Sequence, residues 1–124
     1  MKRVLVVDDA VTVRMYHRQL LEGLGHTVEE AENGVEALEK ALVTPFDLLL
    51  VDVNMPKMDG YRLLKEIRKT TELQATPVIM ISTEAERSDR EQAYNAGANL
   101  YLVKPLRPES FRDYVTLLTG GSTP

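Results

Sequence analysis

The chain has 124 residues, a formal net charge of −4 at pH 7 and 44% hydrophobic residues. This length suits one domain and excludes most multi-domain enzymes, but it allows a core large enough to fold without a disulfide or a metal. The sequence contains no cysteine, which excludes a thiolate metal site and a cysteine nucleophile.

The mildly acidic balance argues against a nucleic-acid backbone as the main partner, because that binding depends on clustered Lys and Arg. No apolar run approaches the ~18 residues needed to span a membrane. The first residues are too acidic for a signal peptide, and their apolar run is too short. We therefore expect a cytoplasmic protein that binds neither membrane nor nucleic acid.

The first part of the chain contains two predicted strand–helix pairs. A continuous apolar run at residues 4–7 predicts a strand covered on both faces, as in a parallel sheet, whereas residues 27–31 are more polar and suit an edge strand. Each strand is followed by apolar residues at helical spacing, with a stop at Gly25, a cap at Asn33 and Pro45 beyond the second helix. These residues are Val13, Tyr16, Leu20 and Leu24 in the first helix, and Val35, Leu38 and Leu42 in the second.

The second part adds three more pairs. Continuous apolar runs predict strands at residues 48–51 and 78–81, and a short strand is predicted at 100–103. One helix follows Gly60, and the last helix has Pro108 near its first turn. The apolar residues that indicate these helices are Leu63, Leu64 and Ile67, and Phe111, Tyr114, Val115 and Leu118.

The helix predicted at residues 86–96 is less apolar than the others. Its candidate inner residues are Ala85, Ala93 and Ala96, which bury little area at ~25 cal/mol per Å². We therefore expect this helix to be the loosest element and the one that moves.

Strand and helix alternate five times, which predicts a doubly wound α/β fold with a five-stranded parallel sheet and helices on both faces. We assign residues 1–119 to this one domain. Residues 120–124, with the sequence GGSTP, suit a flexible tail or the beginning of a linker.

Polar residues follow four of the predicted strands, and ligands of such folds bind beyond the carboxyl ends of the strands. Asp8 and Asp9 follow the first strand, Asp52 the third, Ser82 the fourth and Lys104 the fifth. Taken singly, each has an ordinary structural role, as a helix cap or a turn residue. Together they suit one site, and the sequence has no glycine-rich phosphate loop that would indicate a nucleotide.

Three neighbouring carboxylates need more positive charge than Lys104 supplies, because two charges ~5 Å apart repel by about 3 kcal/mol at an effective dielectric near 20. Mg²⁺ suits this deficit, since it binds carboxylates, keeps several waters and accepts phosphate oxygens. One carboxylate is then available as a nucleophile toward phosphorus. The pattern indicates phosphoryl transfer to an aspartate.

These motifs resemble those of a known family, the receiver domains of two-component response regulators, in particular the stand-alone chemotaxis (CheY-like) type. The resemblance extends from Val4 to about Leu118 and implies a flavodoxin-like fold with strand order 2-1-3-4-5. The matching segments are VLVVDD at 4–9, DVNMP at 52–56, MDG at 58–60, ISTEA at 81–85, GA at 97–98 and YLVKP at 101–105.

The resemblance implies that Asp52 is the phosphoacceptor and receives its phosphoryl group from phosphohistidine on a sensor kinase of the CheA-like type. Asp9, Asp52 and the backbone carbonyl of Asn54 would bind Mg²⁺, or Mn²⁺ in its place, with Asp8 helping through water. Lys104 would contact the phosphoryl oxygens.

The resemblance also implies a switch. Ser82 would bond the phosphoryl group, and Tyr101 would then change rotamer and alter the surface formed by helix 86–96, strand 100–103 and the last helix. Asn54 and Glu84 occupy positions that tune phosphoryl lifetime, and both suit a short lifetime.

The peptide bond between Lys104 and Pro105 is expected to be cis by the same resemblance.

The expected function is signalling rather than turnover of a separate substrate, so we expect no enzyme in the usual sense. Output would be binding to a flagellar switch protein, a phosphatase or the next phosphotransfer protein, by a monomer that could dimerise through the switch surface. The alternatives are a phosphorelay intermediate or a piece of a longer regulator. A small Mg²⁺-dependent phosphohydrolase is disfavoured, because haloacid-dehalogenase phosphatases need Asp-x-Asp and here Asp8 and Asp9 are adjacent.

Overall fold

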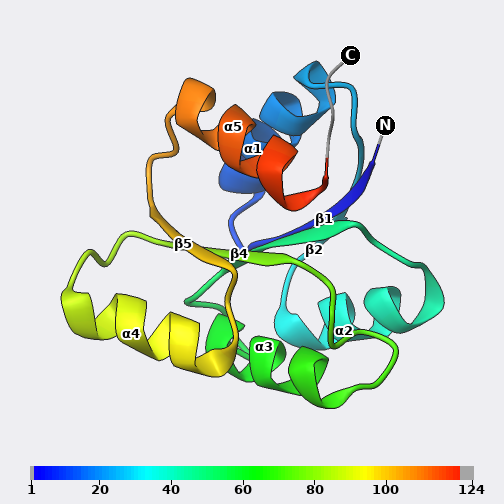
Figure 1. The fold of residues 1–124 in the computed structure, drawn as a ribbon, viewed down its shortest axis with the longest axis vertical. Helices are drawn as coiled ribbons and strands as arrows, with labels where there is room; N and C mark the ends of the chain where they lie inside the picture. Colours follow the sequence, from blue (N-terminus) through cyan, green and yellow to red (C-terminus); the bar gives the residue numbers. More distant parts are fainter. Residues whose placement is uncertain (1, 121–124) are drawn as a thin grey trace.

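Within residues 2–120, five strands alternate with five helices (Figure 1). The structure is a computed structural model and describes residues 2–120. The proposed tail residues 121–124 lie outside the described residues. In order, the elements are β1 (Arg3–Val7), α1 (Val11–Gly23), β2 (Thr27–Ala31), α2 (Gly34–Val43), β3 (Leu48–Asp52), α3 (Gly60–Lys69), β4 (Val78–Ser82), α4 (Arg87–Ala96), β5 (Leu100–Val103) and α5 (Pro108–Leu118).

The strands form one parallel sheet in the order β2-β1-β3-β4-β5. Helices α1 and α5 cover one face, and α2, α3 and α4 cover the other (Figure 1). The predicted doubly wound fold is therefore confirmed. Because all five strands are parallel, their carboxyl ends meet at one edge of the sheet, and this edge positions the candidate site.

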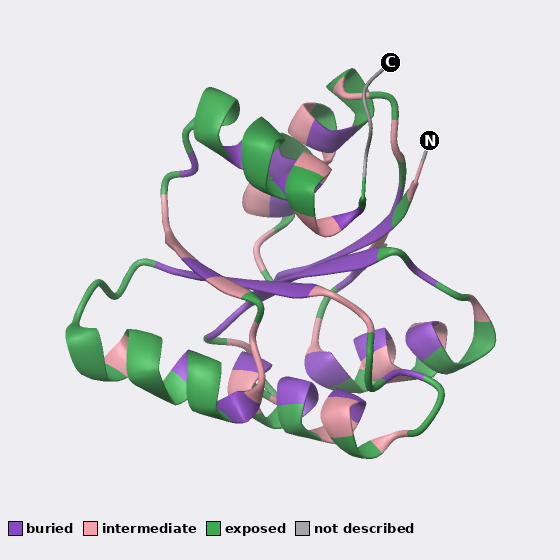
Figure 2. Cartoon of the chain, in the orientation of Figure 1, coloured by how far each residue is buried: buried purple, intermediate pink, exposed green. Residues whose placement is uncertain are grey.

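The central strands β1, β3 and β4 are buried on both faces, as their continuous apolar runs predicted (Figure 2). Alternate residues divide between two cores, since successive side chains of a strand point to opposite faces. Val4, Leu48 and Ile79 pack toward α1 and α5, whereas Leu5 and Leu49 pack toward α2 and α3.

The first two helices bury a different face from the one that their large apolar residues suggested. Helix α1 buries Arg14, His17 and Leu21, while Tyr16 is exposed. Helix α2 buries two alanines and Gly34, whose hypothetical Cβ would lie only 2.6 Å from the backbone oxygen of Met58. Close approach in α2 requires small residues, and in α1 the buried polar side chains lie beside the charged end of the sheet.

Helix α4 has the small buried face that its sequence predicted. Ala93 and Ala96 are buried as predicted, but the prediction for Ala85 is wrong: it is exposed, because the helix begins only at Arg87. The helix ends at Gly97 in the left-handed region, with a φ of 109°. The side chain of the N-cap residue, Glu86, accepts no hydrogen bond from the amides of the first turn. Within residues 2–120, no helix combines the length and the apolar character needed to cross a lipid bilayer.

Candidate functional site

The polar residues predicted at the strand ends lie together at the carboxyl edge of the sheet. Carboxylate oxygens of Asp8, Asp9 and Asp52 lie within 4.8 Å of one another. The Lys104 Nζ donates to Asp52 Oδ1 at 2.9 Å and to Asp8 Oδ2 at 3.1 Å. Residues that follow β1 and β5, and the last residue of β3, thus form one charged cluster.

Burial sets the electrostatics of this cluster. Asp52 is only 5% exposed. Burial raises the pKa of Asp52 to about 6; the hydrogen bond from Lys104 opposes this rise, and the charge of Asp8 adds to it. Burial also acts to lower the pKa of Lys104, but its bonds to Asp52 and Asp8 outweigh this effect, so the pKa is raised and the ammonium stays charged.

The donor set fits a hard divalent cation. Three carboxylates face one ammonium, and Asp9 is exposed and makes no side-chain hydrogen bond with the described part of the chain. Carboxylate oxygens with remaining negative charge are the ligands that Mg²⁺ prefers. Asn54, whose carbonyl was the fourth predicted ligand, follows β3 in an exposed segment.

Ser82 and Tyr101 are connected through the backbone of Glu84. The Glu84 amide donates to Ser82 Oγ at 3.0 Å, and the Tyr101 hydroxyl donates to the Glu84 carbonyl at 2.7 Å. The Tyr101 ring is buried, and the Arg90 guanidinium lies 5.4 Å from its centroid. A change at Ser82 therefore has a direct path to Tyr101 and α4.

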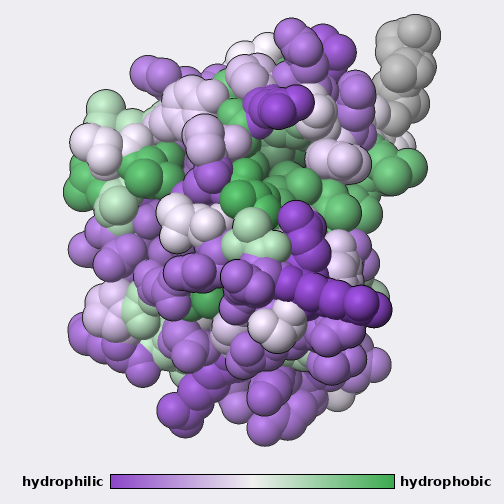
Figure 3. Space-filling model, turned by 90° about the vertical axis from the view of Figure 1, so that its left-hand side faces the viewer, coloured by the Kyte–Doolittle hydropathy of each residue, from purple (hydrophilic) through white to green (hydrophobic). Residues whose placement is uncertain are grey.

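The remaining predicted positions lie around the cluster. The side chains of Asn54 and Glu84 are exposed, and the Lys104–Pro105 peptide bond is cis. An open groove of about 340 Å³ lies beside Lys104, between α1 and the segment after β5. In Figure 3, which looks onto one side of the molecule, apolar side chains gather in the upper half, where Figure 1 places α1 and α5.

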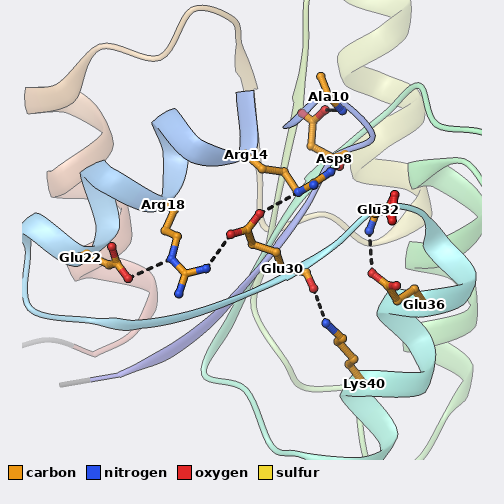
Figure 4. Close-up of polar contacts among 9 residues, drawn as sticks. All are labelled: Asp8, Ala10, Arg14, Arg18, Glu22, Glu30, Glu32, Glu36 and Lys40. Carbon is orange, nitrogen blue, oxygen red and sulfur yellow. Dashed lines mark hydrogen bonds and ion pairs between the residues drawn. The ribbon is translucent and has the colours of Figure 1, made fainter. Parts of the chain in front are cut away.

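Two buried residues near the site were missed by the sequence reasoning. Arg14 donates to the Asp8 backbone carbonyl at 2.7 Å (Figure 4). His17 lies on α1 and is only 2% exposed. Arg14, His17 and Leu21 share one helical face, and this spacing is the signal that could have identified them.

The comparison with protein families settles the class. The sequence matches the family model of the response regulator receiver domain over residues 4–116. The chain belongs to the response regulator receiver domain family. Receiver domains act in two-component signalling, and the predicted resemblance is confirmed at this level.

The chain is similar to part of a longer regulatory protein. The receiver domain is 42% identical over 106 residues to the transcriptional regulatory protein ResD of Bacillus subtilis, an alignment that covers 86% of this chain and 43% of ResD. The chain spans less than half the length of the curated relatives it matches.

Solved structures share the fold over nearly the whole chain. Vibrio cholerae chemotaxis protein CheY4 is 36% identical, with a TM-score of 0.89 and coverage of 95% of this chain and 98% of CheY4. The receiver domain of the Pseudomonas aeruginosa sensor histidine kinase PA1611, described with a magnesium ion in its active site cleft, is 28% identical, with a TM-score of 0.90 and coverage of 97% and 98%.

Proposed function

We propose that this receiver domain accepts a phosphoryl group on Asp52 from the phosphohistidine of a sensor histidine kinase, and signals through the surface formed by α4, β5 and α5. The observation that carries the proposal is the buried Asp52 carboxylate, which Lys104 bonds at 2.9 Å beside two further aspartates. A buried carboxylate with a fixed cationic partner suits nucleophilic attack on phosphorus.

Apart from the nucleophilic oxygen of Asp52, the reaction mainly needs the protein to position the groups and neutralise their charge. A carboxylate oxygen of Asp52 forms the bond to phosphorus while the phosphorus–nitrogen bond of phosphohistidine breaks, and the released imidazole takes up a proton. Lys104 is placed to contact the transferred oxygens, because its ammonium already bonds Asp52. Asp9, Asp52 and the Asn54 carbonyl would hold Mg²⁺, with Asp8 assisting; when bound, the ion neutralises charge on the phosphoryl oxygens.

The switch follows from the bonds around Glu84. A phosphoryl group on Asp52 offers the Ser82 hydroxyl a charged acceptor, and rotation of the hydroxyl toward it would take Oγ away from the amide of Glu84. Because the Glu84 carbonyl holds Tyr101, the rearrangement passes to the packing between β5 and α4. A local charge change thereby alters a binding surface.

The domain would turn over no separate substrate, and would only gain and lose its own phosphoryl group in the cytoplasm. Asn54 and Glu84 are exposed and follow Asp52 and Ser82 by two residues, and we expect them to give a short phosphoryl lifetime. A role in chemotaxis, with a CheA-like kinase upstream and a flagellar switch protein, phosphatase or phosphotransfer protein downstream, is supported by the likeness to CheY4. The likeness to ResD favours the alternative of a receiver from a longer regulator.

Incubation with phosphoramidate and Mg²⁺ tests the proposal. We expect intact-mass spectrometry to detect one phosphoryl addition in the wild type and none in Asp52→Asn. An added chelator should abolish the modification, and Asp47→Asn serves as a control because Asp47 caps the Arg3 amide away from the cluster. Modification of Asp52→Asn to the wild-type extent, or steady turnover of an unrelated phosphomonoester, would contradict it.

A further inference from the structure

Arg14 lies beneath the candidate metal site without touching its carboxylates. The residue is 8% exposed, and its Nη1 donates to the Asp8 backbone carbonyl at 2.7 Å. Its Nε donates to Glu30 Oε1 at 2.8 Å (Figure 4). One guanidinium therefore joins the end of β1 to β2.

The positive charge of Arg14 is paired with Glu30, which is not one of the three clustered aspartates. Glu30 also accepts from Arg18 at 2.6 Å, and Arg18 bonds Glu22 at 2.9 Å. These bonds hold the pKa of Glu30 below its usual range, so its carboxylate stays ionised. A paired guanidinium does not compete with a metal for the aspartates, whereas Lys104 bonds two of them directly.

The bond to the Asp8 carbonyl fixes the peptide plane that leads into Asp9. The other polar groups of Asp8 are also held: its amide by the Ala31 carbonyl, Oδ1 by the Ala10 amide and Oδ2 by Lys104. Asp9 itself is exposed and has no side-chain hydrogen bond within residues 2–120. The direction of its carboxylate therefore depends on the backbone that precedes it.

The geometry points to Arg14 as a positioning residue for the metal site: by holding the Asp8 carbonyl, it presents the Asp9 carboxylate to Mg²⁺. This inference rests on the proposed function for the role of the ion in phosphorylation. Residues that orient metal ligands from outside typically change metal affinity by about 10–100-fold when replaced.

The test compares Arg14→Met with Arg18→Met. Both variants remove one positive charge that is paired with the same Glu30, but only Arg14 bonds Asp8. A pure charge effect would strengthen Mg²⁺ binding slightly in both variants. We instead expect Arg14→Met to weaken Mg²⁺ binding by about tenfold, and Arg18→Met to match or slightly exceed the wild type.

The chain has no tryptophan, so Mg²⁺ titrations are followed by amide NMR shifts. In metal-free protein, the amide of Ala10, which donates to Asp8 Oδ1, should exchange faster in Arg14→Met, with central-strand amides unchanged. At saturating Mg²⁺ the phosphoramidate rate should return to near the wild-type rate. Unchanged Mg²⁺ affinity with only lower thermal stability would overturn the inference and leave Arg14 a structural residue.

If Arg14→Met does not fold, Arg14→Lys provides the second test, since the compact ammonium lacks the planar, forked donors with which Arg14 bonds the Asp8 carbonyl and Glu30. We expect weaker Mg²⁺ binding and faster exchange of the Ala10 amide; wild-type values for both would overturn the inference. The titration needs no phosphoryl donor. A wild type that binds Mg²⁺ but is never phosphorylated would therefore contradict the proposed function while the comparison at Arg14 still stands.

Discussion

His17 is buried beside the charged cluster, and within residues 2–120 its Nδ1 atom has no hydrogen-bond partner. Burial lowers the pKa of His17 to about 4; the charge of Asp8 opposes this change and the charge of Lys104 adds to it. The imidazole is therefore neutral at physiological pH and adds no positive charge next to Lys104.

This burial predicts a pH dependence of stability. Below pH 6.5 the unfolded chain binds a proton at His17, but the folded chain does so only near pH 4, so stability is lost as pH falls through this window. We expect His17→Leu to reduce the loss between pH 7 and pH 5 by about 1–2 kcal/mol, after allowance for solvent screening. Urea unfolding at pH 7 and at pH 5 measures this change in the free energy of unfolding.

His26→Gln is the control, because His26 is only partly buried and accepts a hydrogen bond from the Lys2 amide. His26→Gln should change the loss of stability between pH 7 and pH 5 by less than His17→Leu does. Equal loss of stability in wild type and His17→Leu on acidification would contradict the assigned neutral state of His17.

At the level of single residues, the sequence predicted those site residues that lie at the ends of strands. Asp8, Asp52 and Lys104 each follow an apolar run, and parallel topology brings such positions together. The helical face that Arg14 shares with Leu21 could have indicated its burial, but its role was not predictable, because that role depends on the backbone carbonyl of Asp8. A main-chain acceptor leaves no trace in the residue types of a sequence.

The helices differ in how much apolar area holds each one to the sheet. Helix α3 buries Leu63, Leu64 and Ile67, as its sequence predicted, whereas α4 buries only Ala93 and Ala96. Each large aliphatic side chain contributes about 1.5–3 kcal/mol when fully buried. The difference should therefore appear as unequal local stability.

Native-state hydrogen exchange should detect this difference. We expect amides of α4 to open with a free energy at least about 3 kcal/mol below that of α3 amides, since α4 lacks large buried side chains. Amides of β1 and β3 provide the internal reference for global unfolding. Protection of α4 equal to that of the central strands would show that another interaction holds it.

Strands were easier to predict from sequence than helix faces. β2 and β5 have the predicted bounds, and β1, β3 and β4 each extend by one polar residue, because ladder hydrogen bonds continue past the apolar run. In α1 and α2, neighbours decide which face is buried: Met58 leaves no room for a side chain at Gly34, and Asp8 provides a partner for Arg14. The spacing of apolar residues in one sequence cannot predict either of these contacts.

Across the whole molecule, the site is maintained at a cost to stability. The pKa of Asp52 is raised from 3.8 to about 6, so its contribution to stability is greatest below pH 3.8 and is lost as pH rises through 6. The folded domain at neutral pH therefore keeps a carboxylate that the unfolded chain solvates better.

Asp52→Asn should accordingly stabilise the metal-free domain at pH 7.5 by about 1–2 kcal/mol after allowance for solvent screening, and much less at pH 4. Mg²⁺ should stabilise the wild type more than the variant, because binding to the folded state adds to its stability. Urea unfolding with and without Mg²⁺ at both pH values measures this. A variant less stable than the wild type at pH 7.5 would contradict it.

The hydrogen bond between Lys104 and Asp8 joins residues 96 positions apart in the sequence. A chain emerging from the ribosome has its acidic residues available long before β5 pairs with β4 and brings the ammonium to them. Until then Asp52 is an ordinary solvated aspartate with no fixed cation beside it. Under the proposed function, Asp52 would become able to accept a phosphoryl group only after β5 has paired with β4.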